Sequence, residues 1–313
     1  MDPQLSLRRL EIFRLVVEER SVTRAAEVLL VAQPAVSAQL RALEGWVGAK
    51  LFARQGNRLV LTEAGERTER WAREVLAGAA QVRRDVGDLA SGETGRVIIA
   101  SSMAVGTYIV PPIMAEVGRQ RPRADITVSI SRPEEVVHAV ESGECDMAVL
   151  NWDQRRLPEN IASELLGSFS LSVYAAPGLV PDGARLSAAE ALRLPLVGAP
   201  DTVVYQRNLV TQLRAAGHEE PRFLLRLGHA EAMKNAAVAN GWALIAPAYA
   251  VRAELVAGAL VELAVDDLQL EEHVTLIHRD DKHFSPLQSA AVAAIREGVT
   301  ATAERDLLET HHE

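Results

Sequence analysis

Apolar residues recur every three or four positions in three segments near the start of the chain, which predicts three helices. The apolar positions are Leu10, Phe13 and Val17, then Ala25, Ala26 and Leu29, then Val36, Leu40, Leu43 and Val47. Ser21 offers a capping hydroxyl for the second helix, and Pro34 suits the first turn of the third. Two helices joined by a turn of about three residues are typical of a helix-turn-helix, whose second helix enters the DNA major groove.

The face of the third helix opposite the apolar stripe carries Gln33, Ser37, Ala38 and Arg41. Three of these four residues are polar, and Ala38 is the exception. Glutamine can pair with adenine, arginine with guanine, and serine with several bases. For any one of these residues alone, a solvated surface position is the better interpretation. Their joint position at the start of a helix after a tight turn favours contact with DNA bases.

A short hairpin is predicted over residues 51–62, because Gly56-Asn57 is a turn signal between two apolar segments. Arg54 and Arg58 flank its tip, where a basic wing can reach DNA phosphates or the minor groove. Arg54 fits an ion pair with Glu44 equally well.

A long helix is predicted from Thr62 to about Leu89, since this segment lacks proline and repeats apolar residues at heptad-like spacing. The apolar seam consists of Trp71, Val75, Ala79, Val82, Val86 and Leu89. Such a helix can pack on its own domain. Next to a DNA-reading unit, we favour dimerisation, because paired half-sites need paired DNA-binding units. Residues 90–95 are expected to form a hinge.

Strands then alternate with helices, which predicts an α/β fold with mostly parallel strands. The predicted strands cover residues 97–100, 126–130, 147–150, 171–175, 194–197, 243–245 and 274–278. Ligands in such folds bind at the carboxyl ends of strands, often against helix starts. The polar and neighbouring groups expected there, each of which also fits a cap or loop role, are Ser101, Ser102, Met103, Ser131, Arg132, Asn151, Asp201, Thr202 and His229.

Charge is distributed unevenly over the 313 residues. The net charge is −9, but residues 1–62 carry +3 and the remainder −12, so DNA binding through the basic start is compatible with an acidic body. The single cysteine, Cys145, excludes an intramolecular disulfide and is expected to be a buried structural thiol. Neither a secretory signal nor an apolar run long enough to span a membrane is apparent, so we expect a cytoplasmic protein.

The first 65 residues resemble the winged helix-turn-helix of LysR-type transcriptional regulators. The resemblance follows the segments around residues 8–13, 21–29, 32–44, 48–54 and 61–65. It implies that Gln33, Pro34 and Ser37 lie near base edges, and that Arg54, Arg58 and Thr62 lie near the DNA backbone. Ala32 and Ala38 depart from the family pattern, since many members have serine or threonine at the first position and some have arginine at the second.

The remaining chain resembles the LysR effector domain, which is similar to type 2 periplasmic binding proteins. This resemblance implies two α/β lobes joined by two crossover strands, near residues 162–167 and 261–269, with a small ligand between the lobes. Trp242 stands where glycine is common in the family. The expected domains are 1–62 for DNA binding, 63–92 for the linker helix and hinge, 93–300 for the effector domain, and 301–313 for a polar tail. Lobe I comprises about 96–163 and 268–300, and lobe II about 164–267.

These observations together predict a ligand-responsive, sequence-specific DNA-binding regulator. We find no sequence motif for a catalytic or metal site, so neither catalytic nor metal-binding residues are assigned and no cofactor is expected. The expected partners are promoter DNA, a second copy of the chain in a dimer or tetramer, RNA polymerase, and a small effector, for which Arg132 and helix starts favour a carboxylate. The alternative is a small-molecule-binding protein of the same fold without a role in transcription.

Overall fold

A computed structural model describes residues 5–55, 58–90, 95–152 and 157–310. It divides into two units, one comprising residues 1–90 with 141–144 and the other comprising residues 91–140 with 145–313. Among the described residues, none of the helices is long and apolar enough to cross a membrane.

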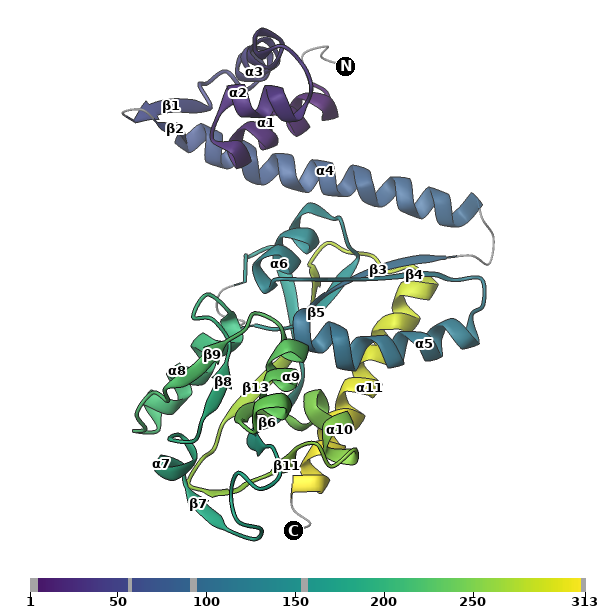
Figure 1. The fold of residues 1–313 in the computed structure, drawn as a ribbon. Coiled ribbons are helices and arrows are strands. Elements are labelled where there is room, and N and C mark those ends of the chain that lie inside the picture. The colour runs from purple at the N-terminus through teal and green to yellow at the C-terminus, as the bar shows by residue number, and fades with distance from the viewer. Residues whose placement is uncertain (1–4, 56–57, 91–94, 153–156, 311–313) are drawn as a thin grey trace. The chain divides into compact units, whose positions relative to one another are not determined.

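The first unit is a three-helix domain with a two-stranded wing and a long helix (Figure 1). Its elements are α1 (Leu7–Glu19), α2 (Val22–Val28), α3 (Gln33–Val47), β1 (Phe52–Gln55), β2 (Arg58–Leu61) and α4 (Glu63–Ala90). Ser6 and Ser21 cap α1 and α2 through their hydroxyls, whereas Ala32 gives α3 no side-chain cap. Leu10, Phe13, Val36, Leu40 and Leu43 are buried together in one core, so the three predicted helices are confirmed.

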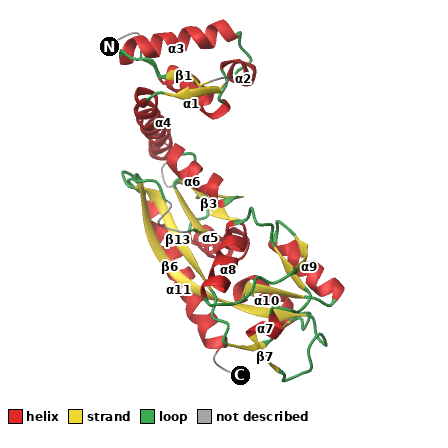
Figure 2. Ribbon diagram, turned by 90° about the vertical axis from the view of Figure 1, so that its left-hand side faces the viewer, coloured by secondary structure: helices red, strands yellow, loops and turns green. Residues whose placement is uncertain are grey.

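The second unit contains one continuous twisted sheet (Figures 1 and 2). Its elements begin with β3 (Arg96–Ser102), the π-helix η1 (Val105–Ile109), α5 (Val110–Gln120), β4 (Asp125–Ser131), α6 (Pro133–Ser142), β5 (Met147–Asn151) and β6 (Ile161–Ala175). They continue with β7 (Arg185–Ser187), α7 (Ala188–Ala191), β8 (Leu196–Gly198), α8 (Val204–Ala215), β9 (Phe223–Arg226), α9 (Ala230–Asn240) and β10 (Ala243–Pro247). The last are α10 (Ala248–Val256), β11 (Val261–Glu262), β12 (Ala264–Asp266), β13 (Glu271–Arg279) and α11 (Pro286–Thr310).

The sheet consists of two halves that share β6. Strands β4, β3 and β5 are parallel, and β13 joins them to the first part of β6 in antiparallel pairing. Strands β10, β8 and β9 are parallel, and β10 pairs with the last part of β6. Because β6 changes partner between Ser170 and Leu171, the first crossover lies there, a few residues beyond the predicted segment 162–167.

Helices cover both faces of each half of the sheet. In lobe I, α5 and α11 share one core with β3, β5, β6 and β13, and α6 packs on the opposite face. In lobe II, α7 and α8 pack on one face of β10, and α9 and α10 on the other. This arrangement gives two α/β lobes whose parallel strands end at a shared edge, as the resemblance to type 2 periplasmic binding proteins implies.

Candidate functional site

The surface of α3 that we expect to read DNA is accessible in the first unit. Gln33, Pro34 and Arg41 are exposed, and Ser37 is half-buried. The amide nitrogen of Gln33 donates a hydrogen bond of 2.9 Å to the Ser37 hydroxyl, which orients both groups at the start of the helix. Val36 lies between them in sequence and is buried in the core, so the helix cannot rotate this polar face inward without losing its packing.

Of the two arginines predicted to contact DNA from the wing, the structure describes the side chain of Arg54. Arg54 is exposed on β1, and the side chain of Arg58 lies outside the described residues. Glu44 pairs with Lys50 at 2.7 Å and also accepts the backbone N–H of Leu51, and within the described residues no ion pair joins it to Arg54. Arg54 therefore remains available to an external anion.

Thr62 occupies the junction between the wing and α4. Its hydroxyl donates to the carbonyl of Lys50 at 2.6 Å and accepts the N–H of Gly65 at 3.0 Å. The side chain thus caps α4, and it fixes the wing to the start of that helix.

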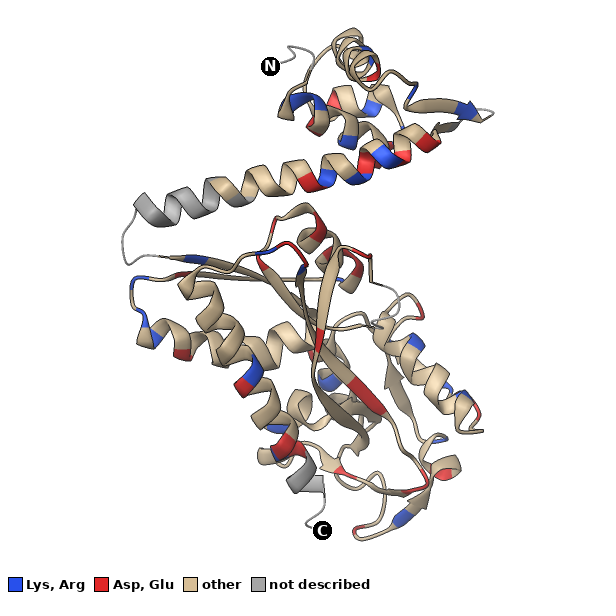
Figure 3. Ribbon diagram, turned by 180° about the vertical axis from the view of Figure 1, so that it is seen from behind, with Lys and Arg blue, Asp and Glu red and all other residues tan. Residues whose placement is uncertain are grey.

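The predicted seam of α4 has two environments. Trp71 and Val75 pack against the core of the helix-turn-helix, and Trp71 stacks on Trp46 with ring centres 5.3 Å apart. Val82 is 61% exposed, and the side chains of Val86 and Leu89 lie outside the described residues. Residues of both charges alternate along the first half of α4 (Figure 3), where Arg67 pairs with Glu63.

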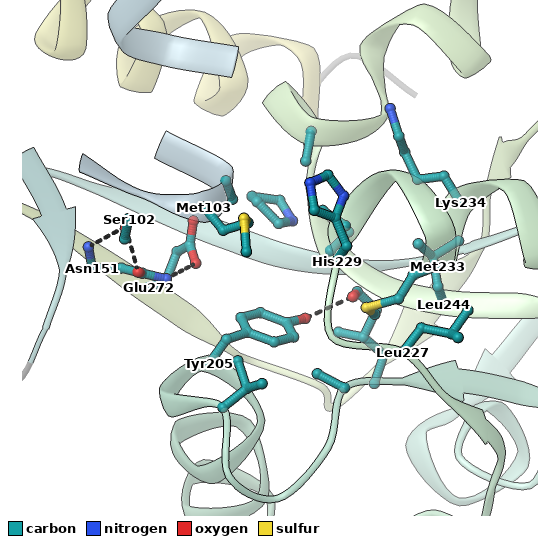
Figure 4. A pocket seen from close by; sticks show the side chains of 18 of the residues that line it. Ser102, Met103, Asn151, Tyr205, Leu227, His229, Met233, Lys234, Leu244 and Glu272 are labelled. Carbon is teal, nitrogen blue, oxygen red and sulfur yellow. Dashed lines mark hydrogen bonds between the residues drawn. The ribbon is translucent and has the colours of Figure 1, made fainter. Parts of the chain in front are cut away.

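A partly open space of about 100 Å³ lies between the two lobes in the second unit. Its wall is formed by strand ends and helix starts from both lobes (Figure 4). The described lining residues are Ser102, Met103, Ala104, Pro133, Asn151, Ala199, Val203, Tyr205, Leu227, Gly228, His229, Ala230, Met233, Lys234, Leu244, Ile245, Ala246, Pro247, Ala250, Val251 and Glu272. Most of them are apolar. We refer to this space as the interlobe cavity.

Four of the predicted effector residues line the interlobe cavity. Ser102 ends β3 and Met103 follows it, Asn151 ends β5, and His229 caps α9. The Ser102 hydroxyl donates to the amide oxygen of Asn151 at 2.9 Å (Figure 4). These residues come from both lobes, so the strand-end argument brought together side chains that are distant in sequence.

Among the described residues, the other five predicted contacts do not line the interlobe cavity. Ser101 is buried and donates to the carbonyl of Val149, because neighbouring residues of β3 point to opposite faces of the sheet. Asp201 is paired with Arg226 at 2.7 Å. The others are Ser131 at the end of β4, the exposed Arg132, and the exposed Thr202.

The sequence analysis missed Glu272, the carboxyl group in the cavity wall. Glu272 is 8% exposed, and its carboxylate oxygens accept hydrogen bonds from the Tyr249 phenol and from the Asn151 amide at 3.2 Å. Burial raises the pKa of Glu272, although these hydrogen bonds oppose the shift. The sequence does contain a signal for the burial of Glu272. Along β13, Glu272 occupies the same alternating positions as the buried Val274 and Leu276.

A polar cluster joins the lobes beside the cavity. The Tyr108 phenol of η1 donates to Glu231 of α9 at 2.5 Å, and the Lys234 ammonium lies 4.7 Å from the centre of the Tyr108 ring. Lys234 also pairs with Glu231 and Glu254, each at 3.0 Å. Burial, together with the bond to Glu231, raises the pKa of Tyr108 to about 12, and the bond from Tyr108 lowers the pKa of Glu231.

A helix-turn-helix followed by a two-lobed α/β domain with a cavity at its strand ends is the architecture of transcriptional regulators that carry a DNA-binding domain and an effector domain in one chain. Residues 7–66 match the family described as bacterial regulatory helix-turn-helix protein, lysR family, and residues 90–300 match the LysR substrate binding domain. The chain belongs to the LysR family.

Individual relatives agree with this assignment. The chain is 30% identical to the HTH-type transcriptional regulator YeiE of Escherichia coli (strain K12), over 90% of this chain and 94% of that protein. It is 32% identical to a probable RuBisCO transcriptional regulator of Trieres chinensis, over 51% of each protein, so that match spans about half of the relative's length. The structure of ArgP from Mycobacterium tuberculosis has the same fold, with a TM-score of 0.63 and 22% identity over 93% of this chain and 96% of that chain.

Proposed function

We propose that this LysR-family chain controls promoters by coupling a small effector in the interlobe cavity to the geometry of paired DNA-binding units. The observation that carries the proposal is the polar start of α3, which stays exposed while the opposite stripe of the helix is buried. Effector binding would favour one arrangement of the two lobes, and through the oligomer would change the spacing of the DNA-binding units and the bend of the promoter.

For DNA recognition, we assign base contacts to Gln33, Pro34, Ser37 and Arg41 and backbone contacts to Arg54, Arg58 and Thr62. The exposure of Gln33 and Arg41 and the availability of Arg54 support this assignment. The Thr62 hydroxyl is engaged in capping α4, so its role toward DNA would be to hold the wing and the helix in register.

For assembly, we propose a dimer formed through α4, with a tetramer as the state in which two dimers span the promoter. The exposed Val82 supports the dimer, because a valine on an otherwise charged helix gains stability when a second copy covers it. We place the protein in the cytoplasm with its DNA, we name RNA polymerase as a partner of the promoter-bound state, and we assign no catalytic activity.

We assign the functions to the segments expected from the sequence. Residues 1–62 would bind DNA, 63–92 would form the linker, 93–300 would bind the effector, and 301–313 would form a tail. Residues of α11 up to Thr310 are helical, so the tail would begin within a helix. A carboxylate effector, expected from the sequence, would need a cation or an uncommitted helix start beside the cavity. Arg132, the cation expected for this role, does not line the cavity.

A mobility-shift experiment tests the proposal with the full-length protein and the intergenic DNA upstream of its gene. We expect a salt-sensitive, sequence-specific shift that Gln33→Ala and Ser37→Ala abolish or weaken. Gln120→Ala is the matched control, because Gln120 lies at the end of α5 in the second unit. A shift that the α3 variants leave unchanged contradicts the assignment of α3, and the absence of any specific shift on this and other promoters contradicts the proposed function.

A further inference from the structure

The chemistry of the interlobe cavity indicates which kind of effector it accepts. We infer that the effector is a small, uncharged, mainly apolar molecule, and this inference rests on the proposed function of the cavity. Its support comes from the helix starts, the lysine and the carboxyl group that surround the cavity, and from the cavity's size.

Two of the helix starts in the cavity wall, those of α9 and α6, already interact with acidic side chains. At α9, the Nδ1 atom of His229 accepts the N–H of Glu231, and the Glu231 carboxylate itself lies in the first turn. At α6, Pro133 has no N–H to offer, and the backbone N–H of Arg132 donates to the carboxylate of Glu135 at 3.2 Å. A carboxylate ligand would therefore compete with the chain's own acidic groups at both helices.

The lysine in the lining is also committed. Lys234 is buried and pairs with Glu231 and Glu254. An anionic effector would have to break two ion pairs to recruit this cation. Breaking a buried ion pair leaves an uncompensated charge, which is strongly unfavourable.

A cationic effector meets the opposite difficulty. The carboxyl group of Glu272 is the acidic group in the described lining, and it already accepts bonds from Tyr249 and Asn151. An ammonium group has three donors, and losing its hydration against a mainly apolar wall, where the one carboxyl group of the described lining is already shared, is costly. A single hydroxyl or amide N–H needs one acceptor, which the second lone pair of a Glu272 oxygen can supply.

The size of the cavity limits the effector further. A dry apolar cavity of roughly 150 Å³ in another protein binds benzene, so by proportion about 100 Å³ accommodates roughly four heavy atoms, and the exposed Gly228 and His229 leave one side of the cavity open. Met103, Leu227, Met233 and Leu244 line it with apolar surface. A small branched alcohol has the size and polarity that this wall favours.

Three probes of one shape test the inference on the full-length protein at neutral pH. They are 2-methylpropan-1-ol, 2-methylpropanoate and 2-methylpropan-1-amine, which differ mainly in the charge of the head group. Calorimetry and ligand-observed NMR measure their affinities. We expect the alcohol to bind at least about tenfold more tightly than either ion.

Cavity-filling variants locate the binding. Ala104→Leu and Ala230→Leu add a side chain at two half-buried positions of the lining and should abolish binding of the alcohol. Ala253→Leu makes the same change at an exposed position of α10 and should leave it unchanged. Circular dichroism and the mobility shift confirm that each variant is folded.

Several results would overturn the inference. These are tightest binding of the carboxylate or of the amine, binding of none of the probes at millimolar concentration, and alcohol binding that survives in both cavity-filling variants. The mobility shift of the wild-type protein with DNA, in the absence of any probe, is measured separately. If the protein shifts its DNA specifically but does not bind the alcohol, only the effector class is rejected. If the wild-type protein gives no specific shift, the proposed function is rejected.

Discussion

Tyr108 of lobe I and Glu231 of lobe II are joined by a hydrogen bond of 2.5 Å, in which the phenol donates to the carboxylate. The two residues are 123 positions apart in the chain, and they lie beside the interlobe cavity because Glu231 opens α9. The buried Lys234 supports both groups from the next turn of the same helix. Any relative movement of the lobes at this point must change this contact.

The phenol of Tyr108 is expected to stabilise the effector unit. Tyr108→Phe removes only the hydroxyl, so it should lower the free energy of unfolding by about 1 kcal/mol, a value kept low because Glu231 is partly exposed. Urea unfolding of Tyr108→Phe, Glu231→Gln and the double variant measures the coupling. Additive effects of the two substitutions would show that the hydrogen bond contributes nothing.

The pH dependence of stability should contain a contribution from Glu272. Burial raises the pKa of its carboxyl group in the folded protein above the ordinary value of 4.5. The folded state therefore binds this proton more tightly than the unfolded state, and the free energy of unfolding falls as pH rises between the two pKa values.

The variant Glu272→Gln removes this ionisation and keeps a side chain of similar size. Its stability relative to wild type should increase from about pH 4.5 upward and then become constant above the folded pKa. Thermal unfolding of both proteins across this range measures the difference. A difference that stays flat, or that decreases with pH, contradicts the raised pKa.

Local sequence patterns predicted the DNA-binding unit well because its structure depends on local signals. Serine caps, a proline in the first helical turn and apolar residues at helical spacing all act within a few residues of one another. The environment of Trp71 and Val75 was less predictable, since the same seam can pack on its own core or on a second copy.

The effector site was harder to predict because strand ends identify a region and not a side chain. Ser101 and Ser102 are neighbours in β3, yet one bonds to Val149 and the other lines the cavity. With helices on both faces of the sheet, burial does not distinguish the two directions. Glu272 was overlooked because its role depends on Tyr249 and Asn151, which are distant in sequence.

Two glycines of α4 should respond oppositely to alanine. A Cβ atom at Gly65 would lie 2.1 Å from the backbone oxygen of Leu51, so Gly65→Ala must displace the wing or the helix and should cost about 2 kcal/mol or more. A Cβ atom at Gly78 meets nothing within 4 Å, so Gly78→Ala should stabilise the helix by about 0.5–1 kcal/mol. Denaturant unfolding compares the two, and equal effects would contradict the close approach at Gly65.

Val82 gives the sharpest test of dimerisation through α4. If a second copy covers this valine, Val82→Asp places two charges in an apolar contact and should raise the dimer dissociation constant at least about a hundredfold. Val256→Asp makes the same change at an 86% exposed valine of α10 and should leave the dimer intact. Sedimentation velocity over a dilution series measures both. A Val82→Asp protein that remains dimeric at the same concentrations as wild type would place the dimer contact elsewhere, because an aspartate cannot be buried in such a seam without a partner.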